Sequence, residues 1–298
     1  MPRPFGLLNL DKPAGVTSRD VVDAVQRLVQ PAKAGHAGTL DPLATGVLVV
    51  CVGPATRLIP FVQDGRKVYR ATFRFGAASE TDDVEGAVTE LPDAPRPTRA
   101  AVEAALPEFV GTIEQVPPAY SAVHVGGRRA YELARKGETV ELAAKPVVVY
   151  RFELIRFDEG TQELDCEIEC GSGTYVRSLG RDLARRLGTA AVMTALRRTA
   201  VGPFRVEDAV PPGELTRENF PDLLAPPESA LAGRPRVALD AARAAAVRNG
   251  RALPLPAGLR LEESEPVTLL DETGRLVAVA AFDPVDATLR PRLVFPPD

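Results

Sequence analysis

The chain has 298 residues, of which 45% are hydrophobic and 26% are charged, so it is long enough for one large domain and a smaller one. Its longest apolar run, residues 47–52, is far shorter than the roughly 20 residues that a membrane helix needs, and its start lacks the charged-then-apolar pattern of a signal peptide. We therefore expect a folded cytoplasmic protein that does not enter a membrane.

The first part of the chain is predicted to hold short strands with one helix between them. Residues 5–10 indicate a strand, and Thr17 or Ser18 caps a helix through about Leu28, whose valines form an apolar face. The next predicted elements are a buried strand at 47–52, a short helix at 55–62, a strand at 68–75 and, after a proline-rich break at 92–97, a helix at 99–106.

The second part continues without regular alternation of strands and helices, which favours an α+β sheet over a doubly wound one. Residues 211–235 are rich in proline and predict a linker or an extended arm. The predicted elements are helices at 131–137, 178–187 and 239–249, strands at 147–155, 164–170, 267–270 and 276–280, and a hairpin turn at 271–274.

Cysteine and histidine usage argues against both disulfides and metal sites. The cysteines Cys51, Cys166 and Cys170 are odd in number, and the last two share the apolar face of a predicted strand, which indicates buried, reduced thiols. The two histidines, His36 and His124, occur without a Cys-x-x-Cys pair, so we predict no metal site.

Charge is distributed unevenly, although the net charge is only −4. Residues 171–205 hold seven arginines against one acid, residues 66–74 hold four basic residues and no acid, and residues 79–93 hold six acids and no base. Such basic clusters suit a substrate with a phosphate backbone. The alternative for residues 181–186 is a solvated helix face.

One carboxylate stands out because of its setting. Asp41 lies in the loop Gly-His-Ala-Gly-Thr-Leu-Asp-Pro-Leu-Ala-Thr-Gly at 35–46, directly before the apolar run. Glycines permit close approaches, and Pro42 restricts Asp41 to extended geometry, so the carboxylate is held by stiff backbone. The alternative is an ordinary Asp-Pro turn before a buried strand.

This loop resembles, almost letter for letter, the catalytic motif of the TruB-type tRNA pseudouridine synthases, which isomerise uridine 55 in the T loop of tRNA. The resemblance covers residues 5–210 strongly and the remainder weakly. Four further segments match in order: Leu-Asp-Lys-Pro-Ala-Gly-Val-Thr-Ser at 10–18, Lys-Val-Tyr-Arg at 67–70, Pro-Pro-Ala-Tyr-Ser-Ala at 117–122 and Gly-Ser-Gly-Thr-Tyr-Val-Arg at 171–177.

The resemblance implies a pseudouridine synthase fold, with a mixed, largely antiparallel sheet flanked by helices. It implies a catalytic domain over residues 1–225, with an RNA-contacting insertion at 79–150, and a small β-rich, PUA-like RNA-binding domain over residues 226–298. Because charges balance in the tail, its RNA role rests on resemblance alone. A β-rich capping domain without a binding role is the alternative.

The implied reaction moves the uracil from an N1–C1′ to a C5–C1′ bond without redox change, so we expect no cofactor. Asp41 would attack the nucleotide or stabilise the sugar; whether it acts at C6, at C1′ or on the 2′ hydrogen stays open. Arg177 matches the family's arginine that pairs with this aspartate. Tyr69 aligns with the tyrosine that stacks on the target base. The alternatives are a phosphate contact for Arg177 and a core position for Tyr69.

The resemblance also implies the residues that bind the substrate. His36 matches the histidine that enters the T loop when the target base flips out. Lys12 and Pro13 match a motif that supports the active-site loop, and Tyr120, Ser121 and Tyr175 are expected in the pocket. His124 stands where relatives commonly have lysine, and Arg128 and Arg129 nearby could replace that phosphate contact. From the basic cluster at 171–205, Arg197 and Arg198 are also expected to contact the RNA backbone.

We expect a monomer that binds the T-stem-loop of tRNA and needs no protein partner. A guide-RNA-dependent synthase shares the Asp41 motif, but the chain has no long lysine-rich tail and has the insertion at 79–150. An RNA-folding chaperone with secondary catalysis is a further alternative. A carbohydrate-active hydrolase is disfavoured because no motif pairs a second carboxylate with Asp41.

Overall fold

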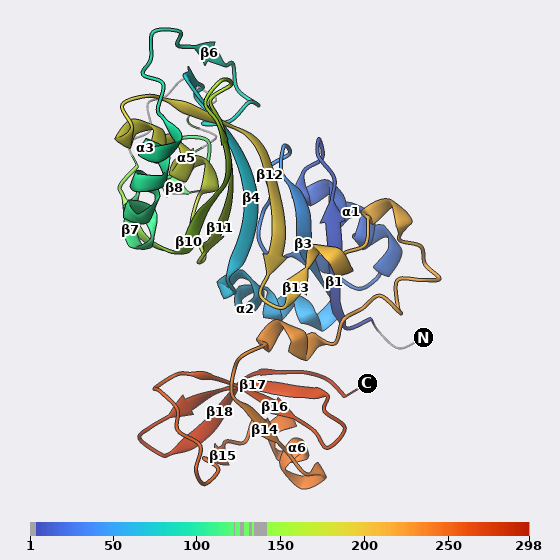
Figure 1. The fold of residues 1–298 in the computed structure, drawn as a ribbon. Helices are drawn as coiled ribbons and strands as arrows, with labels where there is room; N and C mark the ends of the chain where they lie inside the picture. The colour runs from blue at the N-terminus through green and yellow to red at the C-terminus, as the bar shows by residue number, and fades with distance from the viewer. Residues whose placement is uncertain (1–3, 122, 126–127, 131–132, 134–141, 298) are drawn as a thin grey trace.

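A mixed sheet forms the body of the protein in the computed structural model, which describes residues 4–121, 123–125, 128–130, 133 and 142–297 (Figure 1). Seven of its nine strands follow the order β1-β3-β12-β4-β11-β10-β7, with β2 paired to β3 and β13 to β12. The β3–β12 pair is parallel and the other pairs of this sheet are antiparallel, as the predicted α+β fold requires. The strands are β1 (Gly6–Lys12), β2 (Ala34–His36), β3 (Thr45–Val52), β4 (Lys67–Phe75), β7 (Gly111–Gln115), β10 (Lys145–Asp158), β11 (Glu163–Cys170), β12 (Ala191–Val201) and β13 (Phe204–Arg205).

Strand β12 is central to the sheet and was not predicted. It lies between β3, which follows the Asp41 loop, and β4, which carries Tyr69. Arg198 pairs in register with Gly46 on one side and with Tyr69 on the other. The backbones approach closely at Gly46, where φ is 99° and an added Cβ would lie 2.2 Å from the carbonyl oxygen of Arg198.

Helix α1 (Ser18–Val29) begins as predicted. Thr17 is its N-cap, and a capping box with Asp20 satisfies backbone donors at the first turn. Val21 and Val25 are buried in a cluster with residues of β1 and β3. The body also holds the α-helices α2 (Ile59–Asp64), α3 (Arg99–Ala105) and α5 (Val176–Arg186). The helix predicted at 131–137 lies, apart from Leu133, outside the described residues.

Helix α5 carries Arg177 and packs tightly on β4. An added Cβ at Gly180 would lie 2.2 Å from the ring of Phe73, so glycine allows the helix to approach the sheet. This face of the sheet shares one core with α3 and α5. Two short ribbons extend from the body, β5 (Ala77–Ala78) with β6 (Thr89–Glu90), and β8 (His124–Val125) with β9 (Arg128–Arg129).

A second, five-stranded sheet forms the C-terminal unit, below the body in Figure 1. Its order is β14-β16-β17-β18-β15, and the predicted turn at 271–274 joins β16 to β17 with Gly274 at a φ of 82°. This confirms a β-rich C-terminal part. Its elements are β14 (Arg236–Ala238), α6 (Ala241–Arg248), β15 (Leu253–Pro254), β16 (Pro266–Leu270), β17 (Leu276–Asp283) and β18 (Thr288–Val294).

The two units are packed against each other. The rings of Phe5 and Phe295 stack with centroids 5.3 Å apart, and Arg57 donates to the carbonyl oxygen of Val294 at 2.7 Å. The proline-rich stretch at 211–235 is an arm rather than a free linker, because Ala225 exchanges backbone hydrogen bonds with Leu7 of β1.

The predicted state of the cysteines is confirmed, since Cys51, Cys166 and Cys170 are all buried and free. Burial raises the pKa of the Cys170 thiol to about 11, which keeps it protonated and unreactive at neutral pH. Within the described residues, no helix is long and apolar enough to cross a membrane.

Candidate active site

A cleft of about 1440 Å³ opens over the Asp41 loop. Its walls come from that loop, from β4, from the segment 78–89 and from the turn before α5. The cleft brings together seven of the residues predicted from the sequence, which are Asp41, Tyr69, Tyr120, Ser121, Tyr175, Arg177 and Arg198.

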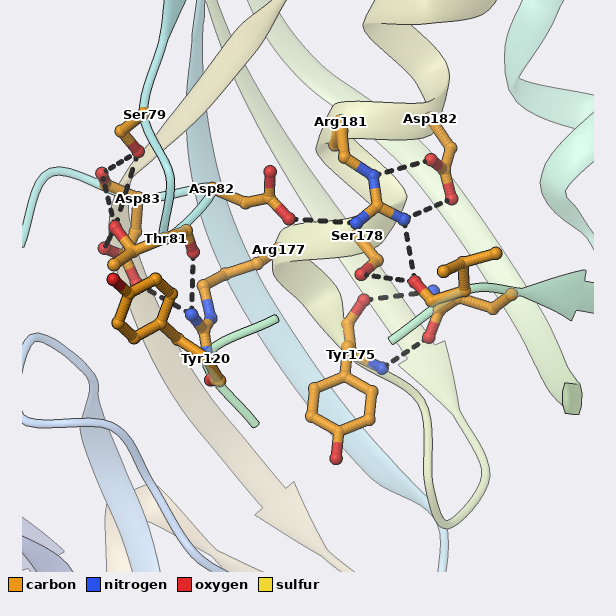
Figure 2. Close-up of polar contacts among 12 residues, drawn as sticks. Ser79, Thr81, Asp82, Asp83, Tyr120, Tyr175, Arg177, Ser178, Arg181 and Asp182 are labelled. Carbon is orange, nitrogen blue, oxygen red and sulfur yellow. Dashed lines mark hydrogen bonds and ion pairs between the residues drawn. The ribbon is translucent and has the colours of Figure 1, made fainter. Parts of the chain in front are cut away.

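Asp41 and Arg177 form an ion pair at this cleft. Arg177 Nη2 lies 3.0 Å from Asp41 Oδ2, and the Arg177 side chain is only 7% exposed, whereas that of Asp41 is 36% exposed. Arg177 also donates to the carbonyl oxygens of Thr81 at 2.7 Å and Tyr120 at 3.3 Å. Figure 2 shows the guanidinium held by these backbone partners. The Asp41 carboxylate lines the cleft and keeps part of its surface exposed.

A second carboxylate, Asp83, binds the same guanidinium and was missed by the sequence reasoning. Its Oδ2 lies 3.3 Å from Arg177 Nη1, and its side chain is almost fully buried. Thr81 Oγ1 and the backbone N–H of Glu85 donate to Asp83 Oδ1 at 2.6 Å and 3.0 Å. The acidic stretch 79–93 offered no signal that would distinguish Asp83 from solvent-exposed acids.

Arg181, one helical turn after Arg177, binds the same segment (Figure 2). It is 12% exposed, lies 3.0 Å from Asp82 and donates to the carbonyl oxygen of Val116 at 2.7 Å. The alternative of a solvated helix face is therefore wrong for Arg181, whereas Arg185 is 68% exposed. Together Arg177 and Arg181 fasten the segment 79–86 to α5.

Buried polar contacts hold the Asp41 loop from the N-terminal side. Lys12 Nζ donates to the carbonyl oxygens of Pro13, Val16 and Pro42 at 2.9, 2.7 and 3.3 Å. Ser18 Oγ donates to the carbonyl oxygen of Leu40 and accepts from its N–H. Lys12 is fully buried, and this burial lowers its pKa. These contacts support the interpretation of Lys12 as a structural residue.

Three tyrosines line the cleft, and of these Tyr69 is the one predicted to contact the base. Tyr69 is 8% exposed, and burial raises its pKa, so its phenol stays neutral at physiological pH. Burial also raises the pKa of Tyr175, whose backbone exchanges two hydrogen bonds with the side chain of Gln115. Stacking of Tyr69 on a base remains a prediction.

His36 lies at the end of β2, five positions before Asp41 and outside the residues that line the cleft. Burial lowers its pKa, and the charges of Arg198 and Arg19 lower it further. Its Nδ1 is buried and has no hydrogen-bond partner among the described residues. A neutral ring suits stacking against bases better than contact with phosphate.

Two of the arginines predicted to contact phosphate, Arg197 and Arg198, lie in different environments. Arg197 is 43% exposed and pairs with Asp11 at 2.8 Å. Arg198 is 1% exposed, and this burial corrects its assignment to the phosphate contacts, because its guanidinium is directed into the protein. The phosphate contacts of Arg128 and Arg129, and the place of His124, stay predictions, because their side chains lie outside the described part of the structure.

Among the described residues, no group of three or more histidine, cysteine, aspartate or glutamate side chains is arranged to hold a metal ion. The site is instead an ion pair, Asp41 with Arg177, beside aromatic side chains at one end of a mixed sheet. That sheet and its carboxylate–arginine cleft define a protein of the pseudouridine synthase class.

The chain belongs to the TruB family of pseudouridylate synthases. The model of the family's N-terminal domain matches residues 26–176, and the tRNA pseudouridylate synthase B C-terminal domain matches residues 177–232, ahead of the second sheet.

Curated relatives and solved structures agree with this placement. The chain is 45% identical to tRNA pseudouridine synthase B of Bradyrhizobium diazoefficiens, over 92% of this chain and 81% of that protein. It is 48% identical to tRNA pseudouridine synthase B of Gluconacetobacter diazotrophicus, over 96% and 89%. A structure of an H/ACA RNP bound to a substrate RNA containing 2'-deoxyuridine aligns with a TM-score of 0.75 at 25% identity, covering 98% of this chain and 86% of the other.

Proposed function

We propose that this protein isomerises uridine 55 in the T loop of tRNA to pseudouridine. The observation that carries the proposal is the Asp41 carboxylate, which faces the cleft 3.0 Å from the buried Arg177 guanidinium, with Tyr69 in the cleft wall. The names of the relatives, tRNA pseudouridine synthase B, support tRNA as the substrate.

The reaction breaks the N1–C1′ bond, turns the uracil and joins C5 to C1′. C5 loses a proton and N1 gains one, so the isomerisation needs no redox partner. Asp41 supplies the carboxylate, acting at C6, at C1′ or on the 2′ hydrogen. Arg177 offsets the cost of keeping that carboxylate ionised in a cleft that the substrate closes to water. The same pairing serves all three routes.

The T loop is a folded structure, so the target uridine must leave its stack to reach Asp41. His36 lies near the start of the Asp41 loop, and its lowered pKa favours a neutral ring, which supports its assignment to the space that the base vacates. The PUA-like role of the C-terminal sheet and the T-stem-loop as the recognised element belong to the same proposal.

Tritium release tests the activity directly. An unmodified T-stem-loop transcript with 5-tritiated uridine at the target position should release tritium into water when the purified protein is added. The same transcript with cytidine at the target and tritiated uridine elsewhere is the matched control and should release none. A lack of release from the uridine transcript would overturn the proposal.

A guide-RNA-dependent reaction is the second candidate, favoured by the structural likeness to an H/ACA RNP. The two candidates differ in what must be added to the assay. Turnover by the protein alone on a tRNA transcript supports stand-alone action. Turnover that requires a guide RNA and partner proteins would favour the second candidate. An RNA-folding role would appear as faster tRNA refolding by an Asp41→Asn variant.

A further inference from the structure

Arg198 is a buried cation that none of the reaction steps described above uses. It is 1% exposed, and its guanidinium donates to three backbone carbonyl oxygens, those of Val47 at 2.7 Å, Gly38 at 3.1 Å and Thr39 at 3.4 Å. Arg198 is the register partner of Tyr69, whose pKa burial raises and Arg198 lowers. Because Gly38 and Val47 lie before and after Asp41 in the chain, one side chain spans the segment that presents Asp41, and it does so beside Tyr69.

The acceptors of Arg198 are neutral. None of the carboxylates in the described part of the chain lies within ion-pair distance of its guanidinium, whereas Arg177 has two such partners, Asp41 and Asp83. A buried charge without a counter-ion is costly, and a neutral donor could bind loop carbonyls without that cost. Holding the loop in place therefore does not explain why the side chain at this position is positively charged.

The effect of this charge is visible on neighbouring side chains. The pKa of Lys67 is lowered to about 8, first by burial and also by the charge of Arg198. The pKa values of Lys12 and His36 are likewise lowered first by burial and also by Arg198. The charge of Arg198 thus acts on groups of β1, β2 and β4, and of these Lys67 lines the cleft together with Tyr69.

The cleft is consequently polarised. Asp41, Asp83 and Glu85 lie on the side of the Asp41 loop and segment 78–89, with Arg177 among them. Arg198 and Lys67 lie on the side of β12 and β4 and have no carboxylate partner among the ion pairs of the described residues. Tyr69, the residue assigned to the base, pairs in register with Arg198 on this positive side.

We propose that Arg198 stabilises the negative charge that the uracil carries while its bond to C1′ is open. The inference rests on the proposed function and holds for each of its three routes. When N1–C1′ breaks, its electron pair stays with the base; after addition at C6, the charge lies on the base as an enolate. The charge disappears when C5 bonds to C1′, C5 loses its proton and N1 gains one. The bond that Asp41 formed to C6 or to C1′ breaks and returns the carboxylate, or the proton that Asp41 took from C2′ returns to C2′. Arg198 acts through its field and by positioning Tyr69.

The test varies the charge on Arg198 and the stability of the base anion together. Target uridine is compared with target 5-fluorouridine, whose base anion is more stable because fluorine withdraws electron density. The readout is the single-turnover loss of the original nucleoside after nuclease digestion, since fluorine at C5 cannot leave as a proton does. Neutral variants Arg198→Gln and Arg198→Met are made, and either one suffices if it keeps the wild-type circular dichroism spectrum and thermal transition.

The neutral variant should slow the uridine substrate more than the fluorouridine substrate, by about tenfold or more. Arg198→Lys keeps a charge and should slow both substrates by the same factor. The matched control is Ser18→Ala, which removes two uncharged hydrogen bonds to Leu40 of the same loop. It should also slow the uridine and fluorouridine substrates by the same factor. Equal slowing of both substrates by the neutral variant would overturn the proposal, and Arg198 would then serve only to hold the Asp41 loop in place. No turnover of the uridine substrate by the wild-type protein would overturn the proposed function instead.

Discussion

Arg197 and Arg198 are neighbours on β12, yet their guanidinium groups lie in opposite environments. That of Arg197 is 43% exposed and forms an ion pair with Asp11, whereas that of Arg198 is 1% exposed and donates to backbone carbonyl oxygens. Adjacent side chains on a strand point to opposite faces of the sheet, so two identical residues acquire different roles. One is available to solvent and RNA, and the other supports the catalytic loop.

Replacement of these two arginines should therefore affect stability very differently. Arg198→Ala leaves three carbonyl oxygens without their donor and should lower the free energy of unfolding by about 2 kcal/mol or more. Arg197→Ala removes a half-exposed ion pair and should cost less than about 1 kcal/mol. Urea unfolding followed by circular dichroism measures both, and equal losses would contradict the difference in burial.

Asp41→Asn should abolish isomerisation while tRNA affinity stays within a few-fold of wild type. The amide keeps the shape of the side chain but removes the nucleophile or base. Tritium release and filter binding measure the two effects separately. Measurable turnover by the pure variant would remove Asp41 from its catalytic role.

Arg177→Lys and Arg181→Lys form a matched pair, because both arginines lie on α5 with little of their side chains exposed and bind acids of the segment 79–86. Only Arg177 also contacts Asp41. We expect Arg177→Lys to lower single-turnover rates by at least about 100-fold, since lysine cannot bind Asp41 and Asp83 with one planar fork. Arg181→Lys should affect stability more than rate. Similar rate losses in the two variants would indicate that both arginines merely hold the fold.

Local signals predicted α1 well, because the hydroxyl of Thr17, the carboxylate of Asp20 and the valine spacing are all contained within one helix. Strand β12 escaped prediction for a physical reason. Register shifts between Met193 and Ala195, and between Arg198 and Ala200, interrupt the alternation that marks a strand. Its arginines were then assigned to the surface, although the strand lies in the middle of the sheet.

The active site, too, could be predicted from the sequence only in part. The Asp41 loop and Arg177 could be identified because the resemblance carries those motifs residue by residue. The pairing of Asp83 with Arg177 could not, because it exists only where the segment after β5 meets the start of α5. Whether an arginine carries its charge to solvent or into the protein likewise depends on packing, as Arg198 demonstrates.

His36 should make stability depend on pH. Its pKa is lowered in the folded protein by burial and then by Arg198 and Arg19, so the unfolded chain binds a proton first as the pH falls below about 6.5. The stabilisation that neutral His36 gives to the folded protein is therefore complete above about pH 6.5. It is lost as the pH falls towards the pKa that His36 has in the folded protein. Between pH 7 and pH 5 the unfolding free energy of wild type should therefore fall more than that of His36→Gln. Parallel urea-unfolding curves against pH would show that His36 is not responsible.

Salt dependence should separate His36 from the exposed arginine in tRNA binding. Arg197→Ala should flatten the slope of log Kd against log salt by about 1, the value of one phosphate contact, because its guanidinium can leave Asp11 for the RNA backbone. His36→Ala should weaken binding of a folded T loop with little change in slope, because a neutral ring releases no counter-ions. Filter binding at several salt concentrations measures both. An unaltered slope in Arg197→Ala, or a large change of slope in His36→Ala, would contradict this division of roles. It would indicate that the phosphate contacts lie on another surface, such as the C-terminal sheet.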